Sequence, residues 1–397
     1  MVLKIILFTF YYPPDLSAGS FRSIALIKAL LKKIDINDEL HVITTHPNRY
    51  PSYKVPANDI DKNSQVSVHR ILLPAHRNGI LSQARAFAVY AFSAYKLCKK
   101  LKPNFIIGTS SRLMTGLLTG FSAYQMQCRY FIDLRDIFSE TISDLFVQKN
   151  KTIGGIFKLV FSFLEKKLFK NASGVNVVSE GFFEYFQSKG IDTSMWTFFP
   201  NGIDREFINL TSNQDKLTNK IKIVLYAGNI GNGQGMETIL PNAAKQLGSD
   251  YQFILIGDGS TKNILEDEIK QQKISNVKVL TPVNRVKLIE HYHKADILFL
   301  HLNDIPAFQR VLPSKIFEYA ALEKPIVAGL RGYSAEFLKS HVPYATVFQP
   351  GNIDECVSLI KKAGHVKKDR EKIDSFKKEY SREVIMNKLA SHILTLV

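Results

Sequence analysis

The chain has 397 residues, of which 45% are hydrophobic and 22% charged, a composition typical of globular proteins of two or three domains. Its 52 Lys and Arg residues outnumber 36 Asp and Glu residues, so the net charge of +16 favours anionic partners such as nucleotides, phosphates, acidic lipids or nucleic acid. No run of about 18 uncharged apolar residues occurs, so a membrane-spanning helix is not expected. The 3 cysteines are too scattered for a zinc site.

The first half alternates apolar segments with helical patterns, which predicts a parallel α/β sheet. The expected strands cover 4–9, 41–44, 105–107, 130–134 and 175–178. The expected helices cover 21–33, 80–101, 113–124, 156–169 and 181–188.

The alternation restarts after the polar stretch 210–220, which we interpret as a domain boundary. The expected strands of the second half are 222–230, 252–259, 277–280, 296–302 and 325–329. The expected helices are 236–247, 262–272, 286–293 and 314–322. We therefore predict two doubly wound Rossmann-like domains, 1–205 and 206–378, and a C-terminal helix, 379–397, that packs back towards the first domain. Ligands of such sheets bind beyond the carboxyl ends of the strands.

The loop 11–23, YYPPDLSAGSFRS, joins the first expected strand to the first expected helix. Gly19 permits close approach of the backbone, the amides at the helix start attract anions, and Arg22 adds positive charge. The loop predicts either an anion-binding surface or an ordinary strand-to-helix turn.

Two glycine-rich segments, GNIGNGQG at 228–235 and IGDGS at 256–260, follow strands of the second half. Their spacing is not GxGxxG, and no suitably placed acidic residue follows, so a nicotinamide cofactor is not expected. We interpret the first segment as a phosphate-binding loop. In the second, Gly257 allows tight turning and Asp258 is expected to cap the next helix.

The stretch LPSKIFEYAALEKPIV, 312–327, contains a helix start at Pro313 and Ser314. The first amides of this helix have no intrahelical acceptor and can bind a diphosphate, with Lys315 adding positive charge. Glu318 lies one turn further on, where its carboxylate can accept two hydrogen bonds from a ribose diol. The alternative is that Glu318 is a solvated helix residue.

Further segments stand in the chain in this order: DLRD (133–136), VVSEG (177–181), PNGID (200–204), YAGNIGNGQG (226–235), IGDG (256–259) and ADILFLHL (295–302). With the loop 11–23 and the stretch 312–327, they resemble the retaining family-4 glycosyltransferases with the GT-B fold, whose two Rossmann-like domains face a central cleft. The resemblance covers nearly the whole chain. It is nearest to the subgroup that transfers amino sugars in bacterial surface-polysaccharide synthesis. It implies an acceptor-side N-terminal domain and a donor-nucleotide C-terminal domain.

The resemblance assigns donor contacts residue by residue. Glu318 takes the position of the second Glu of the family's Glu-x7-Glu motif, which contacts the nucleotide ribose, whereas the first Glu is replaced by Arg310. The family's diphosphate-binding Arg and Lys correspond to Asn229 and Gln234. Arg310 and Lys315 are therefore expected, with the amides of 231–235, to neutralise the diphosphate.

Other positions complete the expected site. Ser314 and Gly257 belong to the donor side, and Pro282 and Val283 are expected to line the base. On the N-terminal side, Gly19 faces the cleft. The position of the family's catalytic-side His corresponds to Arg135, followed by Asp136, with Asp133 as an alternative. Both aspartates can equally be residues that order the loop.

The implied activity is metal-independent transfer of a hexose-type sugar, a HexNAc or deoxyamino sugar, from a UDP-sugar to a polyprenyl-diphosphate-linked glycan in capsule or O-antigen synthesis. No cofactor is expected. One alternative is a nucleotide-sugar 2-epimerase on the same fold, and another is a non-catalytic glycan-assembly subunit. Aromatic and basic RNA-binding patterns are missing, so nucleic acid is not expected as a partner.

The segments 80–102 and 155–170 combine apolar residues with lysines, a pattern typical either of interfacial helices or of helices packed on a sheet with exposed lysines. A basic surface would attract anionic lipid. We therefore expect a cytoplasmic protein that is peripheral on the inner face of the cell membrane.

Overall fold

The computed structural model describes residues 2–49, 55–63, 65–74, 80–110, 113–137, 151–210, 221–363 and 369–397. The chain forms two compact units: the first joins Met1–Arg49, Lys54–Asn201 and Glu383–Val397, and the second consists mainly of Gly202–Arg382. The expected boundary stretch lies, from residue 211 onward, outside the described residues.

The first unit contains an 8-stranded sheet in the order β3-β4-β2-β1-β5-β6-β7-β8. Its strands are β1 (Lys4–Phe8), β2 (Glu39–Thr45), β3 (Ile60–Asn63), β4 (Val66–Ile71), β5 (Phe105–Ser110), β6 (Arg129–Leu134), β7 (Gly174–Val177) and β8 (Thr197–Phe198). The β3–β4 pair is antiparallel and the other pairs are parallel. The central strands β1 and β5 are almost continuously apolar and buried, as expected for parallel strands covered on both faces.

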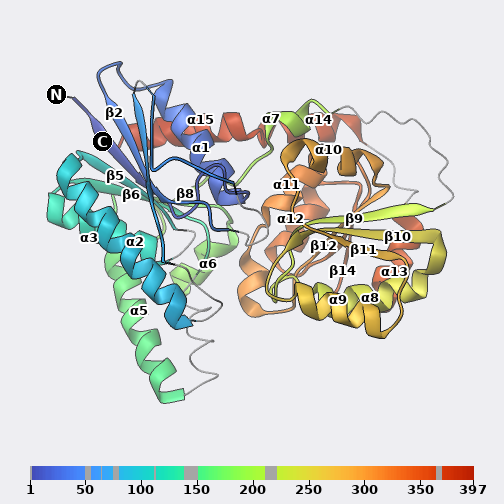
Figure 1. Cartoon of the computed structure of the whole chain (residues 1–397). Helices are drawn as coiled ribbons and strands as arrows, with labels where there is room; N and C mark the ends of the chain where they lie inside the picture. The colour runs from blue at the N-terminus through green and yellow to red at the C-terminus, as the bar shows by residue number, and fades with distance from the viewer. Residues whose placement is uncertain are drawn as a thin grey trace. The chain divides into compact units, whose positions relative to one another are not determined.

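The helices of the first unit are α1 (Ala18–Leu31), α2 (Ile80–Leu101), α3 (Leu113–Met126), α5 (Lys151–Asn171), α6 (Gly181–Ser188) and, from Glu383 on, α15 (Arg382–Leu394). Helices α2, α3 and α5 lie side by side, and α3 packs on β5 and β6 (Figure 1).

The second unit contains a 6-stranded parallel sheet in the order β11-β10-β9-β12-β13-β14. Its strands are β9 (Lys222–Asn229), β10 (Tyr251–Asp258), β11 (Val277–Leu280), β12 (Ile297–His301), β13 (Ile326–Gly329) and β14 (Ala345–Phe348). Its helices are α7 (Arg205–Ile208), α8 (Met236–Leu247), α9 (Lys262–Gln271), α10 (Arg285–Lys294), α11 (Ser314–Ala321), α12 (Tyr333–His341), α13 (Ile353–Lys362) and α14 (Arg370–Glu379), with short 3-10 helices η1 (Gly248–Asp250) and η2 (Pro306–Arg310).

The strand order of this second sheet reverses at β9. The chain runs outward from β9 through β10 to β11 and then returns to β12 on the other side of β9. The loops after β9 and β12 therefore diverge at the carboxyl edge of the sheet, which is the ordinary ligand site of a doubly wound fold.

Several elements differ from those expected. The hairpin β3–β4 and the strand β14 are short, and β3 (IDKN) is polar, so periodicity did not indicate them. Asp258 does not cap α9, because Thr261 precedes that helix, and the Asp258 carboxylate instead accepts the Gly259 amide at 2.9 Å.

Candidate functional site

Helix α11 carries the carboxylate that the sequence singles out. Pro313 precedes the helix in an extended conformation, so Ser314 is its first residue and the chain enters the helix abruptly. Ile316 and Phe317 are buried, and the hydroxyl of Tyr319 accepts the Ala227 amide of β9 at 3.1 Å. These contacts hold the start of α11 at the carboxyl edge of the sheet.

The side chain of Glu318 lies in a small polar cluster, although the residue is only 5% exposed. Lys315 Nζ lies 2.8 Å from Glu318 Oε2, and the Tyr292 hydroxyl donates to the same oxygen at 3.3 Å. Lys315 Nζ also donates to the Tyr292 hydroxyl oxygen at 3.2 Å. We call Tyr292, Lys315 and Glu318 the Glu318 cluster. Glu318 is therefore not the solvated helix residue that the sequence allowed as an alternative.

The cluster keeps its carboxylate ionised. Burial by itself would raise the pKa of Glu318, but the Lys315 ammonium and the Arg285 guanidinium hold it below its ordinary value. Burial also disfavours the charged form of Lys315 and by itself would lower the pKa of this lysine. The Glu318 carboxylate outweighs burial, so the pKa of Lys315 is raised. A buried negative charge with a cation beside it is thus available to accept hydrogen bonds.

A second ion network, which the sequence reasoning missed, lies beside this cluster. Asp204 pairs with Arg285 and, at 2.5 Å from Nε, with Arg382, while Arg285 Nε donates to Glu206 at 2.8 Å. Arg285 also lies 4.6 Å from the centre of the Phe207 ring. Asp204 is the last residue of the PNGID segment. In the sequence this segment contributed only to the family resemblance, although its acidic residue was a signal for this network.

The loops after β9 and β12 are joined by polar contacts. Asn229 donates to the Gln234 side-chain oxygen at 2.7 Å, so these two expected donor-side residues contact each other. The Asn303 amide donates to the Gly233 carbonyl at 2.9 Å. His301 Nδ1 lies 2.7 Å from the Gln234 carbonyl, while its Nε2 accepts the Gly351 amide at 3.2 Å.

The remaining donor-side candidates lie at neighbouring strand ends. Gly257 lies near the end of β10, where an added Cβ would lie 1.9 Å from the Gly228 carbonyl oxygen, so only glycine allows the two strand ends to approach. Pro282 and Val283 follow the edge strand β11 and are half-buried, and Arg310 ends η2. All three segments stand at the carboxyl edge of one sheet.

In the first unit, Asp133 is locked in a buried ion pair. Arg22 Nε and Nη2 donate to its two oxygens at 2.7 and 2.8 Å, and Asn176 donates to one of them at 2.8 Å. Arg22 also donates to the carbonyls of Phe199 and Pro200. Asp133 has no exposed surface and both of its oxygens accept hydrogen bonds, so it links β6 to α1 and β7.

The structure brings Gly19 and Arg135 together. A Cβ added to Gly19 would lie 2.3 Å from Arg135 Nη1, so the guanidinium rests directly on the backbone at the start of α1. Arg135 is buried, and its Nη2 lies 3.5 Å from the Asn201 side-chain oxygen. Asp136, by contrast, is exposed.

In the described part of the chain, no group of three or more His, Cys, Asp or Glu residues has the arrangement of a metal site. None of the helices in that part has the length and apolar character needed to cross a membrane.

Comparison with known proteins finds a family model that matches part of the chain and individual relatives of it. Residues 208–380 match the family model described as Glycosyl transferases group 1. The chain is 23% identical over 380 residues to WcaI of Escherichia coli K12, described as a colanic acid biosynthesis glycosyl transferase, covering 91% of this chain and 92% of that protein. A 2-deoxystreptamine N-acetyl-D-glucosaminyltransferase of Niallia circulans is 28% identical over 135 residues, 33% of each protein.

Solved structures share the fold over the full length. Anabaena Alr3699/HepE in complex with UDP and glucose superposes with a TM-score of 0.67 at 15% identity, covering 100% of both chains. A sucrose-phosphate synthase from Thermosynechococcus elongatus gives a TM-score of 0.72 at 14% identity, covering 99% of both chains.

Proposed function

The chain is a glycosyltransferase with the GT-B fold, and from this premise we propose that it moves a sugar from a UDP-sugar to a lipid-linked glycan acceptor with retention of anomeric configuration. The transferred sugar is a HexNAc or a deoxyamino sugar, and the product belongs to capsule or O-antigen synthesis. The similarity to a colanic acid enzyme and to an N-acetylglucosaminyltransferase supports this choice.

The observation that carries the proposal is the Glu318 cluster at the carboxyl edge of the second sheet. Its carboxylate is ionised, buried and bonded to a lysine whose side chain is 21% exposed. A ribose diol can take the place of Lys315 on Glu318, and the ammonium then turns to the diphosphate. Structures of HepE, which has the same fold, contain UDP and UDP-glucose.

Departure of the nucleoside diphosphate builds negative charge on its phosphate oxygens, and fixed donors that meet this charge lower the barrier. Lys315, Arg310 and the first amides of α11, beginning at Ser314, supply these donors. Within the expected loop 231–235, the amides of Gln234 and Gly235 already donate to the Gly231 carbonyl, so the amides of 231–233 are the ones proposed to bind the phosphate. Asn229 and Gln234 contribute neutral amide groups where relatives have charges.

The rest of the site follows from the same assignment. Gly257, Pro282 and Val283 line the nucleotide end of the donor. Gly19, Arg135 and Asp136 belong to the acceptor-side domain, with Arg135 fixed on the Gly19 backbone. The domain limits that we propose are 1–205 and 206–378, with 379–397 as the C-terminal helix.

The acceptor is a polyprenyl-diphosphate-linked glycan, and the protein works at the cytoplasmic face of the cell membrane. The net charge of +16 supports this part of the proposal, because both an acceptor diphosphate and anionic lipids attract a cationic protein. The proposed reaction is metal-independent, so added EDTA should leave the transfer rate unchanged.

The donor assignment is tested by calorimetric binding of UDP, 2′-deoxy-UDP and uridine. Glu318→Gln should weaken UDP binding about tenfold or more and should abolish the difference between UDP and 2′-deoxy-UDP. Lys315→Gln should weaken UDP binding but leave uridine binding nearly unchanged. Glu371→Gln, an exposed change on α14, is the matched control. Wild-type affinity for UDP in both site variants would refute the assignment.

The reaction itself is tested by product analysis. A UDP-sugar that stabilises the protein against heat is incubated with and without a lipid-linked acceptor. The proposal predicts sugar transfer only with acceptor. An epimerised UDP-sugar, or an epimerised free sugar released together with UDP, formed without acceptor would instead identify the epimerase alternative.

A further inference from the structure

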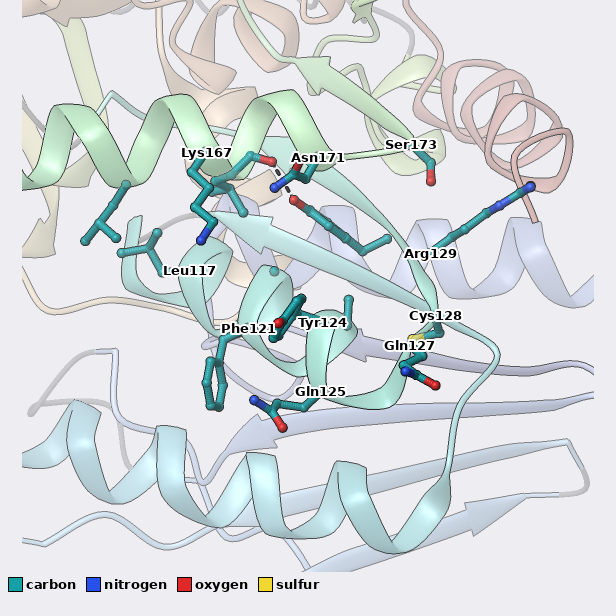
Figure 2. A pocket seen from close by; sticks show the side chains of 15 residues that line it. Leu117, Phe121, Tyr124, Gln125, Gln127, Cys128, Arg129, Lys167, Asn171 and Ser173 are labelled. Carbon is teal, nitrogen blue, oxygen red and sulfur yellow. Dashed lines mark hydrogen bonds between the residues drawn. The ribbon is translucent and has the colours of Figure 1, made fainter.

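A groove opens on the first unit between α3 and α5, with a volume of about 990 Å³. Leu117 and Phe121 of α3 line it together with Leu164 and Leu168 of α5. Polar side chains also line it: Gln125, Gln127, Arg129, Asn171 and Ser173. Lys167 reaches from α5 toward α3 and brings an ammonium group into the groove (Figure 2). The proposed sugar transfer uses none of these residues.

The walls of the groove are held by close packing. The Tyr130 hydroxyl donates to the Leu168 carbonyl at 2.5 Å (Figure 2). A Cβ added to Gly120 would lie 2.8 Å from a Leu168 methyl carbon, so α3 and α5 approach closely at this point. The groove is therefore a built feature of the fold.

Large apolar side chains are exposed on the two helices that form the groove. Tyr124 is 79% exposed, Leu159 74% and Phe163 67%. The exposed apolar residues on these helices are Val89 and Phe92 of α2, Met114, Phe121 and Tyr124 of α3, and Leu159, Val160 and Phe163 of α5. Rings of Tyr95 and Phe121 lie 5.3 Å apart and connect α2 to α3. We call this set the α3–α5 surface, and an exposed apolar area of this kind marks an interaction site.

The charges around the α3–α5 surface have one sign. The exposed lysines of α2 and α5 are Lys96, Lys99, Lys100, Lys166, Lys167 and Lys170. The sequences of α2 and α3 contain no acidic residue. The sole acidic residue of α5, Glu165, is buried and lies 3.7 Å from Lys189. An apolar centre with a cationic border matches the interface of an anionic bilayer.

We propose that the α3–α5 surface docks on anionic phospholipid bilayers and that the groove takes one phospholipid, with its phosphate on Lys167 and an acyl chain between α3 and α5. A second copy of the chain fits less well, because two such surfaces would bring like charges together. The inference rests on the proposed function for its use, since a lipid-linked acceptor requires an enzyme at the membrane.

The structure locates this surface differently from the sequence pattern. Of the apolar residues in the segment 80–102, Phe87, Ala94 and Cys98 are buried in the core. On α5, Leu168 is buried, whereas Leu159 and Phe163 are exposed. Helix α3, which contributes half of the groove, has no charged residue and gave no interfacial signal.

The experiment is sedimentation with vesicles of phosphatidylcholine alone or with phosphatidylglycerol added, using the full chain. Binding should require the anionic lipid and should fall with added salt. Leu159→Ser and Phe163→Ser should each lower the partition coefficient about tenfold or more, and Lys167→Gln about fivefold. Ile36→Ser and Lys33→Gln, exposed changes elsewhere in the first unit, are the controls and should bind as wild type.

Native mass spectrometry with short-chain phosphatidylglycerol tests the groove itself. The wild type should retain one lipid, Lys167→Glu should retain none, and millimolar inorganic phosphate should not displace it. Equal binding to neutral vesicles, or control-like binding by the variants, would overturn the inference. So would a shift from dimer to monomer in sedimentation velocity caused by Phe163→Ser. UDP affinity, measured in parallel, should not change in any of these variants, so failure of the lipid site is separable from failure of the donor site.

Discussion

Two buried pairs of a cation and a carboxylate, Arg22–Asp133 in the first unit and Lys315–Glu318 in the second, differ in how completely they are bonded. In the first unit, the Arg22 and Asp133 side chains have no exposed surface. Arg22 donates to both oxygens of Asp133 and to two backbone carbonyls, and Asn176 adds a further hydrogen bond. Both partners are committed to contacts within the protein and neither reaches solvent, so this pair is poorly placed to bind a ligand.

In the second unit, the pair of Lys315 and Glu318 is less complete. One ammonium group is shared between Glu318 and the Tyr292 hydroxyl, and part of the lysine side chain reaches solvent. A lysine can turn away on its flexible side chain, whereas an arginine held by two carbonyls cannot. Incomplete hydrogen bonding at the carboxyl edge of the sheet thus distinguishes a candidate ligand site from an ion pair that only stabilises the fold.

The largest expected effect is on the architectural pair. Asp133→Asn leaves the Arg22 charge buried without its counter-ion and should lower the free energy of unfolding by about 3–5 kcal/mol. Trp196, the single tryptophan, packs on Phe169 and Phe186 in the first unit and reports its unfolding in urea. Lys32→Ala, which breaks the exposed Lys32–Glu383 pair, should cost less than about 1 kcal/mol. Equal losses of unfolding free energy in Asp133→Asn and Lys32→Ala would contradict an architectural role for the Arg22–Asp133 pair.

Glu318→Gln should weaken UDP binding more than it destabilises the fold. Because Lys315 can move to solvent, the loss in unfolding free energy should be about 1–2 kcal/mol, below that of Asp133→Asn. UDP affinity should fall more strongly than stability, whereas Asp133→Asn should leave UDP affinity intact in the folded fraction. Both quantities come from urea titration and calorimetry of the same preparations. If Glu318→Gln were as unstable as Asp133→Asn, Glu318 would also be a residue that mainly stabilises the fold.

Gly19→Ala tests the contact between Gly19 and Arg135. The new methyl group displaces the end of a flexible side chain, so stability should change by less than about 1 kcal/mol. The displaced guanidinium should lower the transfer rate severalfold, without a change in UDP affinity. Gly155→Ala, on α5 with no atom within 4 Å of the added Cβ, should leave the rate unchanged. An unaltered rate in Gly19→Ala would exclude Arg135 from the reaction.

The smallest effect concerns His301. Burial lowers its pKa from the ordinary 6.5, and its Nε2 accepts a hydrogen bond that protonation would remove. The fold therefore favours neutral His301, and this stability is present above pH 6.5 and lost as pH falls through the folded-state pKa. Hydrogen exchange of 231–235 and 349–352, corrected for intrinsic rates, should increase modestly below pH 6.5. Exchange that is independent of pH would contradict the assigned tautomer.

The sequence by itself determined the α/β alternation, the order of the segments, and the start of α11 at Pro313 and Ser314. These features depend on short-range causes: hydrophobic period, proline geometry and glycine at turns. It also placed Ser314 and Glu318 on one face of α11, because residues four apart on a helix are neighbours.

Tertiary structure alone decided which charges meet. Arg22 and Asp133 are 111 residues apart, and Tyr292 reaches Glu318 from another helix, so no local pattern joins them. It also decided which faces of α2 and α5 are buried, since each helix carries apolar residues on more than one side. Strand order and helix packing depend on contacts between residues far apart in the sequence. They decide whether a given residue lies in the core, forms an ion pair or is exposed.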